Sequence, residues 1–323
     1  MDIRKAYDIE YNELMKKPYG YMVTLDKDSL MLRSVNSKEM QITACCMVCD
    51  YIYEKGFNNV AKILKTKRGK YYIKDEKSIY VLIDKEVEKK FKIKSKKDAV
   101  DIAYTLAQFH NLSEGYVPLA GVKLDVLWGR KIKKYKKLTC CIEKFNDLLS
   151  DTNNPDEFCN VSLDYINDLL KRAKIITKFL HSNEYINYLE DSMKRKEICI
   201  NSMSINTFKF HEGNLILDDI YNIGYNMVEE DIALLVKRAI YEAKDKAVFN
   251  DIIKEYRTWR KLDDFSLDII KALVSYPYDS IKIIEKYIKD PSKGEELTAK
   301  FIKYLKRDMI TDILEVQKFG VQV

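Results

Sequence analysis

The chain has 323 residues, of which 46% are hydrophobic and 11% aromatic, a composition typical of a folded protein and unlike that of a disordered one. At this length about three quarters of the unfolded surface can be buried, so the chain has room for two lobes or domains. The net charge of +6 comes from 56 basic and 50 acidic residues that are interleaved along the chain, which argues against a nucleic-acid partner.

The sequence shows neither a membrane-spanning segment nor a secretory signal. No run of 18 apolar residues occurs, and the N-terminal residues lack the apolar core of a signal peptide. Seven cysteines in such a context indicate reduced thiols in a cytosolic compartment. Cys46 and Cys49 have the spacing of a redox or zinc motif, but they lie in an apolar helical pattern. We therefore interpret them as small buried hydrophobic residues.

Residues 1–83 read as a small α+β lobe. An irregular start is followed by a hairpin with strands at Tyr21–Leu25 and Ser29–Val35. Asn36, with Glu39 three residues later, predicts a capping box for a helix that ends near Glu54, before Gly56. Three more strands are expected at Val60–Thr66, Tyr71–Lys74 and Ile79–Ile83.

The charged segment 84–95 is expected to connect this lobe to a helical one over 96–323. A cleft between two such lobes is a usual ligand site. Amphipathic patterns predict helices at 97–112, 128–149, 162–181, 184–195, 228–244, 247–258, 266–276, 279–289 and 293–317. The second of these carries six basic residues between positions 130 and 137, which we interpret as a solvated face, with an anionic partner as the alternative.

Residues 198–219 interrupt the helices and have the layout of a small reaction centre. A strand leads into a polar loop, and a hairpin with arms Phe208–Phe210 and Leu215–Leu217 then ends at Asp218 and Asp219. In phosphotransferases such a layout puts a base-bearing loop beside a metal-binding aspartate. Residues 199–207 of this loop contain neither a carboxylate nor a histidine. The strand, loop and hairpin of a phosphotransferase site are present, but the side chains that would take part in phosphate transfer have changed.

Several stretches between residues 20 and 290 resemble the CotS family of bacterial spore coat proteins, which is related to aminoglycoside and choline phosphotransferases. The most similar is Leu106–Tyr116 (LAQFHNLSEGY), and the others are Leu30–Val35, Gly56–Lys70, Ser78–Leu82, Cys199–Asp219, Asp231–Arg238 and Tyr276–Asp279. The resemblance implies a two-lobed protein-kinase-like fold of the α+β class, with a small β-rich N-terminal lobe and a larger helical C-terminal lobe.

The departures from the family pattern bear on the reaction. The family's strand lysine, which reaches nucleotide phosphates, falls on Arg33, and arginine is not a conservative replacement for a compact ammonium. The family's base falls on Ser202 and its second metal ligand on Thr207. Its metal-binding aspartate falls on Asp219, while a second aspartate becomes Tyr221. A serine cannot act as a carboxylate base near neutral pH, a role worth roughly 10²–10⁴ in rate.

Nucleotide binding remains open on these residues. Asp219, with Asp218 as a second choice, can supply the one or two carboxylates that Mg²⁺ often needs beside phosphate oxygens, and Arg33 can hold a phosphate. No cofactor is required, although ATP and Mg²⁺ could then bind. The alternative is that the two aspartates only cap a hairpin in solvent. A shift of one residue would instead place Asn206 at the second ligand position.

We therefore interpret the chain as a spore-coat-associated pseudokinase that binds partners in coat assembly. The alternatives are an atypical ATP-dependent small-molecule phosphotransferase, with Glu212 or Asp218 as an unassigned carboxylate in the cleft, and a non-catalytic nucleotide-binding sensor. The resemblance implies the mother-cell cytoplasm and then the spore coat as locations, and other coat proteins as partners. His110 lies on an apolar helical face and is expected to pack in the core, and a zinc site is not expected.

Overall fold

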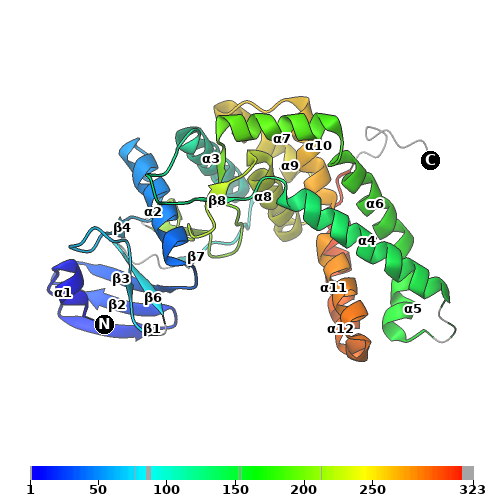
Figure 1. The fold of residues 1–323 in the computed structure, drawn as a ribbon, viewed down its shortest axis with the longest axis horizontal. Coiled ribbons are helices and arrows are strands. Elements are labelled where there is room, and N and C mark those ends of the chain that lie inside the picture. Colours follow the sequence, from blue (N-terminus) through cyan, green and yellow to red (C-terminus); the bar gives the residue numbers. More distant parts are fainter. Residues whose placement is uncertain are drawn as a thin grey trace.

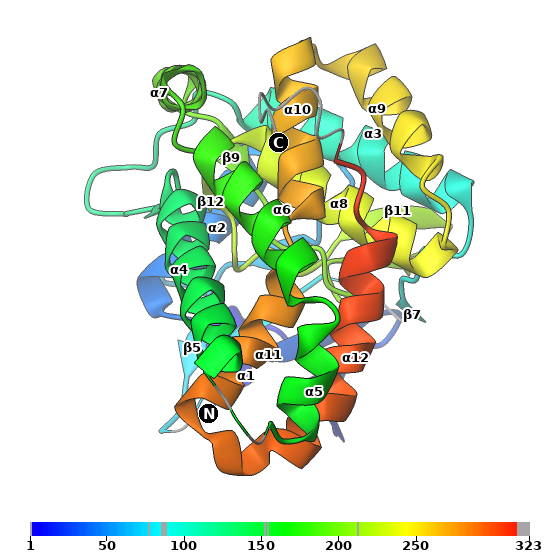
Figure 2. The same ribbon diagram turned by 90° about the vertical axis from the view of Figure 1, so that its right-hand side faces the viewer.

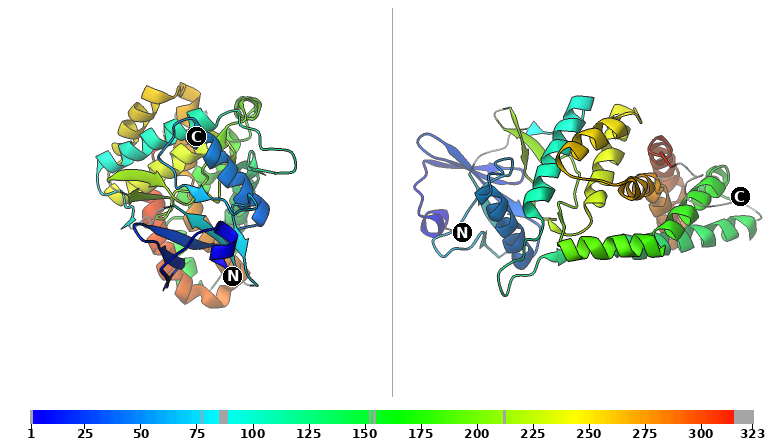
Figure 3. Two further views of the ribbon diagram at one scale, coloured as in Figure 1. Left: turned by 90° about the vertical axis from the view of Figure 1, so that its left-hand side faces the viewer. Right: turned by 90° about the horizontal axis from the view of Figure 1, so that it is seen from above.

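The computed structural model describes residues 2–76, 78–84, 89–151, 153, 155–211 and 213–314. A small sheet-bearing part lies at one end of the molecule and a larger, mostly helical part extends from it (Figure 1). The view from above in Figure 3 shows the same division, with the helices running away from the sheet. The expected two-lobed α+β architecture is confirmed.

The N-terminal sheet has strands in the order β1-β2-β3-β6-β4, all antiparallel neighbours, and β5 also pairs with β6. Gly20, the first residue of β2, lies opposite Arg33 of β3 with φ of +145°. A Cβ at this position would lie 2.0 Å from the backbone oxygen of Leu32, so only glycine allows the two strands to approach. The strands are β1 (Glu13–Lys17), β2 (Gly20–Thr24), β3 (Ser29–Val35), β4 (Ile63–Leu64), β5 (Ile73–Lys74) and β6 (Ile79–Ile83).

Helices α1 (Ile3–Tyr7) and α2 (Glu39–Glu54) complete this lobe. The predicted capping box at the start of α2 is wrong, because Lys38 is the N-cap residue and makes no side-chain cap. The Glu39 carboxylate instead accepts hydrogen bonds from Lys74 Nζ (2.8 Å) and the Tyr72 hydroxyl, so it links α2 to the segment around β5. Cys46 and Cys49 are buried in the hydrophobic core, as predicted. Strand β1 and helix α1 lie in the stretch that was predicted only as irregular.

The connecting segment contributes a strand to the second lobe. Within it, β7 (Lys89–Lys90) pairs with β10 (Phe208–His211), which forms a hairpin with β11 (Asn214–Leu217). The lobe boundaries at 83 and 95 therefore remain a prediction. A second small sheet has the order β8-β12-β9, with β8 (Asp125–Val126), β9 (Ile198–Cys199) and β12 (Gly224–Tyr225). The two small sheets thus contain all the strands described for residues 198–225, the stretch predicted to interrupt the helices.

The remaining elements are helices, and the first, α3 (Lys96–Ser113), starts at a capping box formed by Ser95 and Asp98. Figure 2 shows α4, α6, α11 and α12 facing the viewer, at the end of the molecule opposite the N-terminal sheet. There α4 packs against α6 and α11. The helix predicted over 162–181 is α6, which spans Ile166–Phe179, whereas α5 was not predicted and α12 ends at Ile310 instead of 317. The helices are α4 (Arg130–Asp151), α5 (Glu157–Leu163), α6 (Ile166–Phe179), α7 (Asn183–Arg195), α8 (Val228–Ala243), α9 (Val248–Trp259), α10 (Asp264–Ser275), α11 (Tyr278–Lys289), the 3₁₀ turn η1 (Pro291–Lys293) and α12 (Gly294–Ile310). No helix in the described part of the chain is long and apolar enough to cross a membrane.

Candidate functional site

A cavity of about 500 Å³ lies where the first strands of the N-terminal sheet face the end of the β10–β11 hairpin. The two lobes meet there, so residues from both line it. They are Lys17, Pro18, Tyr19, Met31, Arg33, Ser34, Val35, Asn36, Ser37, Asn206, Lys209, Asp218, Asp219, Tyr221 and Asn222. The volume is within the range of small-molecule and cofactor sites. The structure thus brings Arg33 into one cavity with Asp218 and Asp219, which follow it by more than 180 positions in the sequence.

Two cations hold the carboxylate of Asp218. Arg33 donates from its two terminal nitrogens to Asp218 Oδ2 and Oδ1, at 2.8 and 2.9 Å, in a bidentate pair. Lys209 Nζ lies 2.6 Å from Asp218 Oδ2. The carboxylate is only 2% exposed, and the two cationic side chains are 14% and 15% exposed. Asp218 therefore joins the sheet of the first lobe to the hairpin of the second through a nearly buried ion triad.

Asp219, the next residue, has a different electrostatic environment from that of Asp218. Burial, followed by the nearby negative charge of Asp218, raises the pKa of Asp219 against the opposing effects of a backbone hydrogen bond and the two cations. Within the described parts of the chain, no Lys, Arg or His forms an ion pair with it. Helix α2 contacts the segment that follows Asp219 through an amide side chain and not through a carboxylate. Gln41 Nε2 donates to the carbonyl oxygen of Ile223 at 2.9 Å.

The loop before β10 is closed by hydroxyl groups. The Ser202 and Thr207 hydroxyls are 3.0 Å apart, and Thr207 Oγ1 also accepts the backbone N–H of Ser204 at 2.9 Å. The backbone carbonyl of Thr207 in turn accepts the N–H of Asp218 at 2.9 Å. Thr207 is fully buried, so its hydroxyl supports the loop from inside. The five-residue spacing of Ser202 and Thr207 places them in contact, and neither supplies a charged group.

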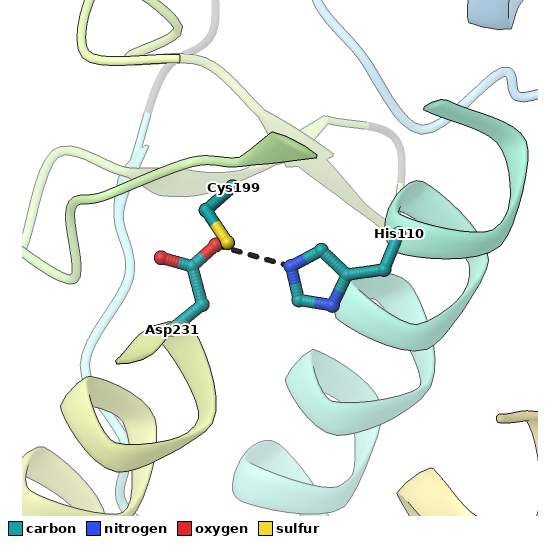
Figure 4. A group of neighbouring side chains, drawn as sticks. All are labelled: His110, Cys199 and Asp231. Carbon is teal, nitrogen blue, oxygen red and sulfur yellow. Dashed lines mark hydrogen bonds and ion pairs between the residues drawn. The ribbon is translucent and has the colours of Figure 1, made fainter. Parts of the chain in front are cut away.

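A buried cluster beneath this loop fixes its backbone. Figure 4 shows His110, Cys199 and Asp231 converging from α3, β9 and α8. Asp231 accepts the backbone N–H groups of Ile200 (2.6 Å) and Asn201 (2.8 Å), and His110 Nε2 lies 3.2 Å from its Oδ2. His110 is 1% exposed, so its predicted place in the core is confirmed.

The partners of this cluster account for its atoms without a metal ion. His110 Nδ1 lies 2.8 Å from the Tyr256 hydroxyl, so both ring nitrogens are engaged. The Cys199 thiol donates to the carbonyl oxygen of Met227 at 3.1 Å, and burial raises its pKa well above the ordinary value. A protonated thiol is a poor metal ligand, because the thiolate is the form that binds. We therefore interpret the cluster as a brace for the loop.

The residues at the cavity do not fit the divalent cation that a phosphotransferase uses. Mg²⁺ demands oxygen ligands in near-octahedral geometry, whereas three N–H groups of two cations already occupy the Asp218 oxygens. Thr207 offers a hydroxyl that is engaged within the loop, and burial raises the pKa of Asp219, so that its carboxylate ionises less readily here than in water. Asn206 lines the cavity and is exposed, and its backbone N–H donates to the Ser204 hydroxyl at 3.1 Å.

The sequence prediction missed Lys209, although strand alternation could have found it. Phe208 is fully buried in β10, so Lys209 must point to the other face, and that is the face of the cavity. Glu212, one of the two carboxylates that an atypical enzyme would use, lies outside the described residues. The other, Asp218, does face the cavity but is held by the two cations.

Comparison with known proteins supports the kinase-like fold. The model of the family described as "Spore coat putative kinase YutH" matches residues 1–129. An aminoglycoside phosphotransferase from Alicyclobacillus acidocaldarius is similar with a TM-score of 0.80 at 14% identity, over 97% of this chain and 93% of that one. An amicoumacin kinase is similar with a TM-score of 0.64 at 16% identity, over 98% and 95%.

A more distant similarity extends to a choline kinase from Cryptosporidium parvum, with a TM-score of 0.52 at 12% identity, over 96% of this chain and 90% of that one. At these identities the likeness shows the fold and leaves the reaction open. The family match and the fold confirm the resemblance to a spore coat family with the architecture of aminoglycoside and choline kinases.

Proposed function

We propose that this chain, whose first 129 residues match a spore coat kinase family, is a pseudokinase that transfers no phosphate and acts by binding partners during coat assembly. The observation that carries the proposal is the state of Asp218, whose carboxylate is neutralised by Arg33 and Lys209 in a cavity where a phosphotransferase needs metal-binding oxygens.

The loop supports the same proposal. Phosphoryl transfer depends on positioning and on charge stabilisation by metal ions, together with a residue that accepts or orients the proton of the attacking group. Ser202 has no charge to offer, and its hydroxyl is hydrogen-bonded to Thr207. A missing base alone would reduce the rate by roughly 10²–10⁴. With the metal ligands also altered, little transition-state stabilisation is left.

The fold around the site is nevertheless intact. The Asp231 carboxylate accepts two backbone N–H groups of the loop, and Thr207 is buried. Both features keep the loop in a defined conformation. A retained scaffold with altered reactive groups is what a binding role requires. Other spore coat proteins are the proposed partners, and the mother-cell cytoplasm and then the coat are the proposed locations.

The test is ATP turnover by the purified protein with Mg²⁺ or Mn²⁺, followed as release of inorganic phosphate. We expect no turnover above that of the Asp219→Ala variant. As a matched control, Asp147→Ala removes an exposed aspartate on α4 that does not line the cavity. Turnover by the wild type and by Asp147→Ala that disappears in Asp219→Ala would overturn the proposal in favour of an atypical phosphotransferase.

The partner role has its own test in a spore-forming host. A tagged protein carrying Asp219→Ala should reach the coat to the same extent as the wild type, because binding does not depend on phosphate transfer. Loss of coat association in this variant, with normal protein levels, would tie the role to the cavity and contradict a scaffold that works without a reaction or ligand there.

A further inference from the structure

We infer that the cavity between the lobes binds a phosphate-bearing ligand without a divalent cation, with Arg33 and Lys209 in the role that a metal ion would otherwise have. The inference rests on the proposed function in one respect, which is that the cavity is not a reaction centre.

The first step is the occupation of Asp218. An ionised carboxylate offers two oxygens with about four lone-pair positions, and Arg33 and Lys209 fill three of these with N–H groups at 2.6–2.9 Å. A divalent cation would have to take the one remaining position or displace a side chain that is itself mostly buried, and in either case it would sit beside positive charges. Like charges at such separations in a partly buried site repel strongly. The internal cations therefore exclude the metal ion.

The second step is the donor capacity that remains. The guanidinium of Arg33 has five N–H groups and the ammonium of Lys209 has three, and the ion triad uses two and one of these. Both residues line the cavity, and each side chain keeps about one seventh of its surface exposed. The planar fork of an arginine matches the oxygens of a phosphate. The remaining N–H groups can thus reach a phosphate that enters the cavity.

The third step is the charge of the lining. Lys17, Arg33 and Lys209 contribute three cations. They outnumber the two acids of the lining, Asp218 and Asp219, and Asp218 is already paired with two of them. A phosphotransferase with free metal-binding carboxylates would repel phosphates unless a metal ion were present. Here the lining favours an anion by itself.

The ligand class follows from size and charge. A cavity of about 500 Å³ accommodates a nucleotide or an inorganic polyphosphate. The chemistry common to both is a chain of phosphates, and the apolar side chains of Met31 and Val35 in the lining offer a surface for a base.

The experiment is thermal unfolding of the full chain with ATP or with inorganic tripolyphosphate, each in excess EDTA and in excess Mg²⁺. We expect the midpoint to rise equally in EDTA and in Mg²⁺, by roughly 5 °C at 100 times Kd. A rise with both probes indicates a polyphosphate site, and a rise with ATP alone indicates a nucleotide site. Lys209→Met should weaken the effect about tenfold in ligand concentration, while Lys92→Met, at an exposed position outside the lining, should not.

Two results would overturn the inference. A rise that appears only with Mg²⁺ would show that a metal ion completes the site after all. No rise with either probe would show that the ion triad closes the cavity, and the pseudokinase proposal would stand, because a protein without a ligand also transfers no phosphate. Comparison of EDTA with Mg²⁺ on the wild type needs no variant, so the test holds even if Lys209→Met fails to fold.

Discussion

Asp218 and Asp219 are adjacent carboxylates, and the structure predicts that replacing each with asparagine has a different effect on the free energy of unfolding. In Asp218→Asn, Arg33 and Lys209 lose the charge that neutralises them, and three charge-assisted hydrogen bonds at 2.6–2.9 Å are lost or weakened. Removing one partner from a buried ion pair costs about 3–5 kcal/mol. The two cations retain 14% and 15% exposure and can turn toward the cavity, so we take the lower limit, about 3 kcal/mol.

Such a loss lowers the unfolding midpoint by about 6 °C, at roughly 2 °C per kcal/mol for a chain of this length. Asp219→Asn is the matched control. Burial raises the pKa of Asp219, so its ionised form is disfavoured in the folded protein, and the amide should change stability by less than about 0.5 kcal/mol or increase it. Urea and thermal unfolding at pH 7, followed by circular dichroism, measure both. Equal losses in the two variants, or an Asp218→Asn midpoint within 1 °C or so of the wild type, would refute the ion triad.

Two further predictions concern other parts of the fold. Gly20→Ala places a Cβ against the backbone of β3 at a φ of +145°, so the strand that carries Arg33 must shift; we expect a loss of at least about 2 kcal/mol in urea unfolding, and a wild-type midpoint would contradict this. Burial, assisted by the charge of Glu197, raises the pKa of Glu229 from 4.5 to about 7. Because the folded protein then holds this proton more tightly than the unfolded chain, stability falls as pH rises from about 4.5 to 7, by roughly 3 kcal/mol. Glu229→Gln should remove this fall between pH 5 and pH 8, and an unchanged pH dependence would show that the carboxyl is not buried as described.

Local patterns were enough to predict much of the fold. Alternating apolar residues located β2, β3 and β6, and three- and four-residue periodicity located most of the helices. The order of the elements predicted a small sheet-rich lobe followed by helices, and the resemblance to a spore coat family implied that this architecture is kinase-like. The short helix α5 was not predicted, because its seven residues are too few for a periodic pattern to be recognised.

The arrangement of the cavity could not be predicted in the same way, because it depends on contacts between distant segments. The sequence places a cation at Arg33 and carboxylates at 218 and 219, but it does not show which carboxylate Arg33 reaches. Lys209 joins the same carboxylate through the pairing of β10 with β11, where Lys209 lies opposite Ile216. The capping prediction at Asn36 failed for a similar reason, since the Glu39 carboxylate accepts hydrogen bonds from Tyr72 and Lys74, which are more than 30 positions away.

The most direct test of the account is a crystal structure of the protein grown with a non-hydrolysable ATP analogue and excess Mn²⁺, whose anomalous scattering identifies the metal. We predict phosphate oxygens within hydrogen-bonding distance of Arg33 and Lys209, both cations still paired with Asp218, and no metal ion on that carboxylate. A manganese ion coordinated by Asp218, with Arg33 and Lys209 turned away from it, would contradict the claim that internal cations have replaced the metal and with it the reaction.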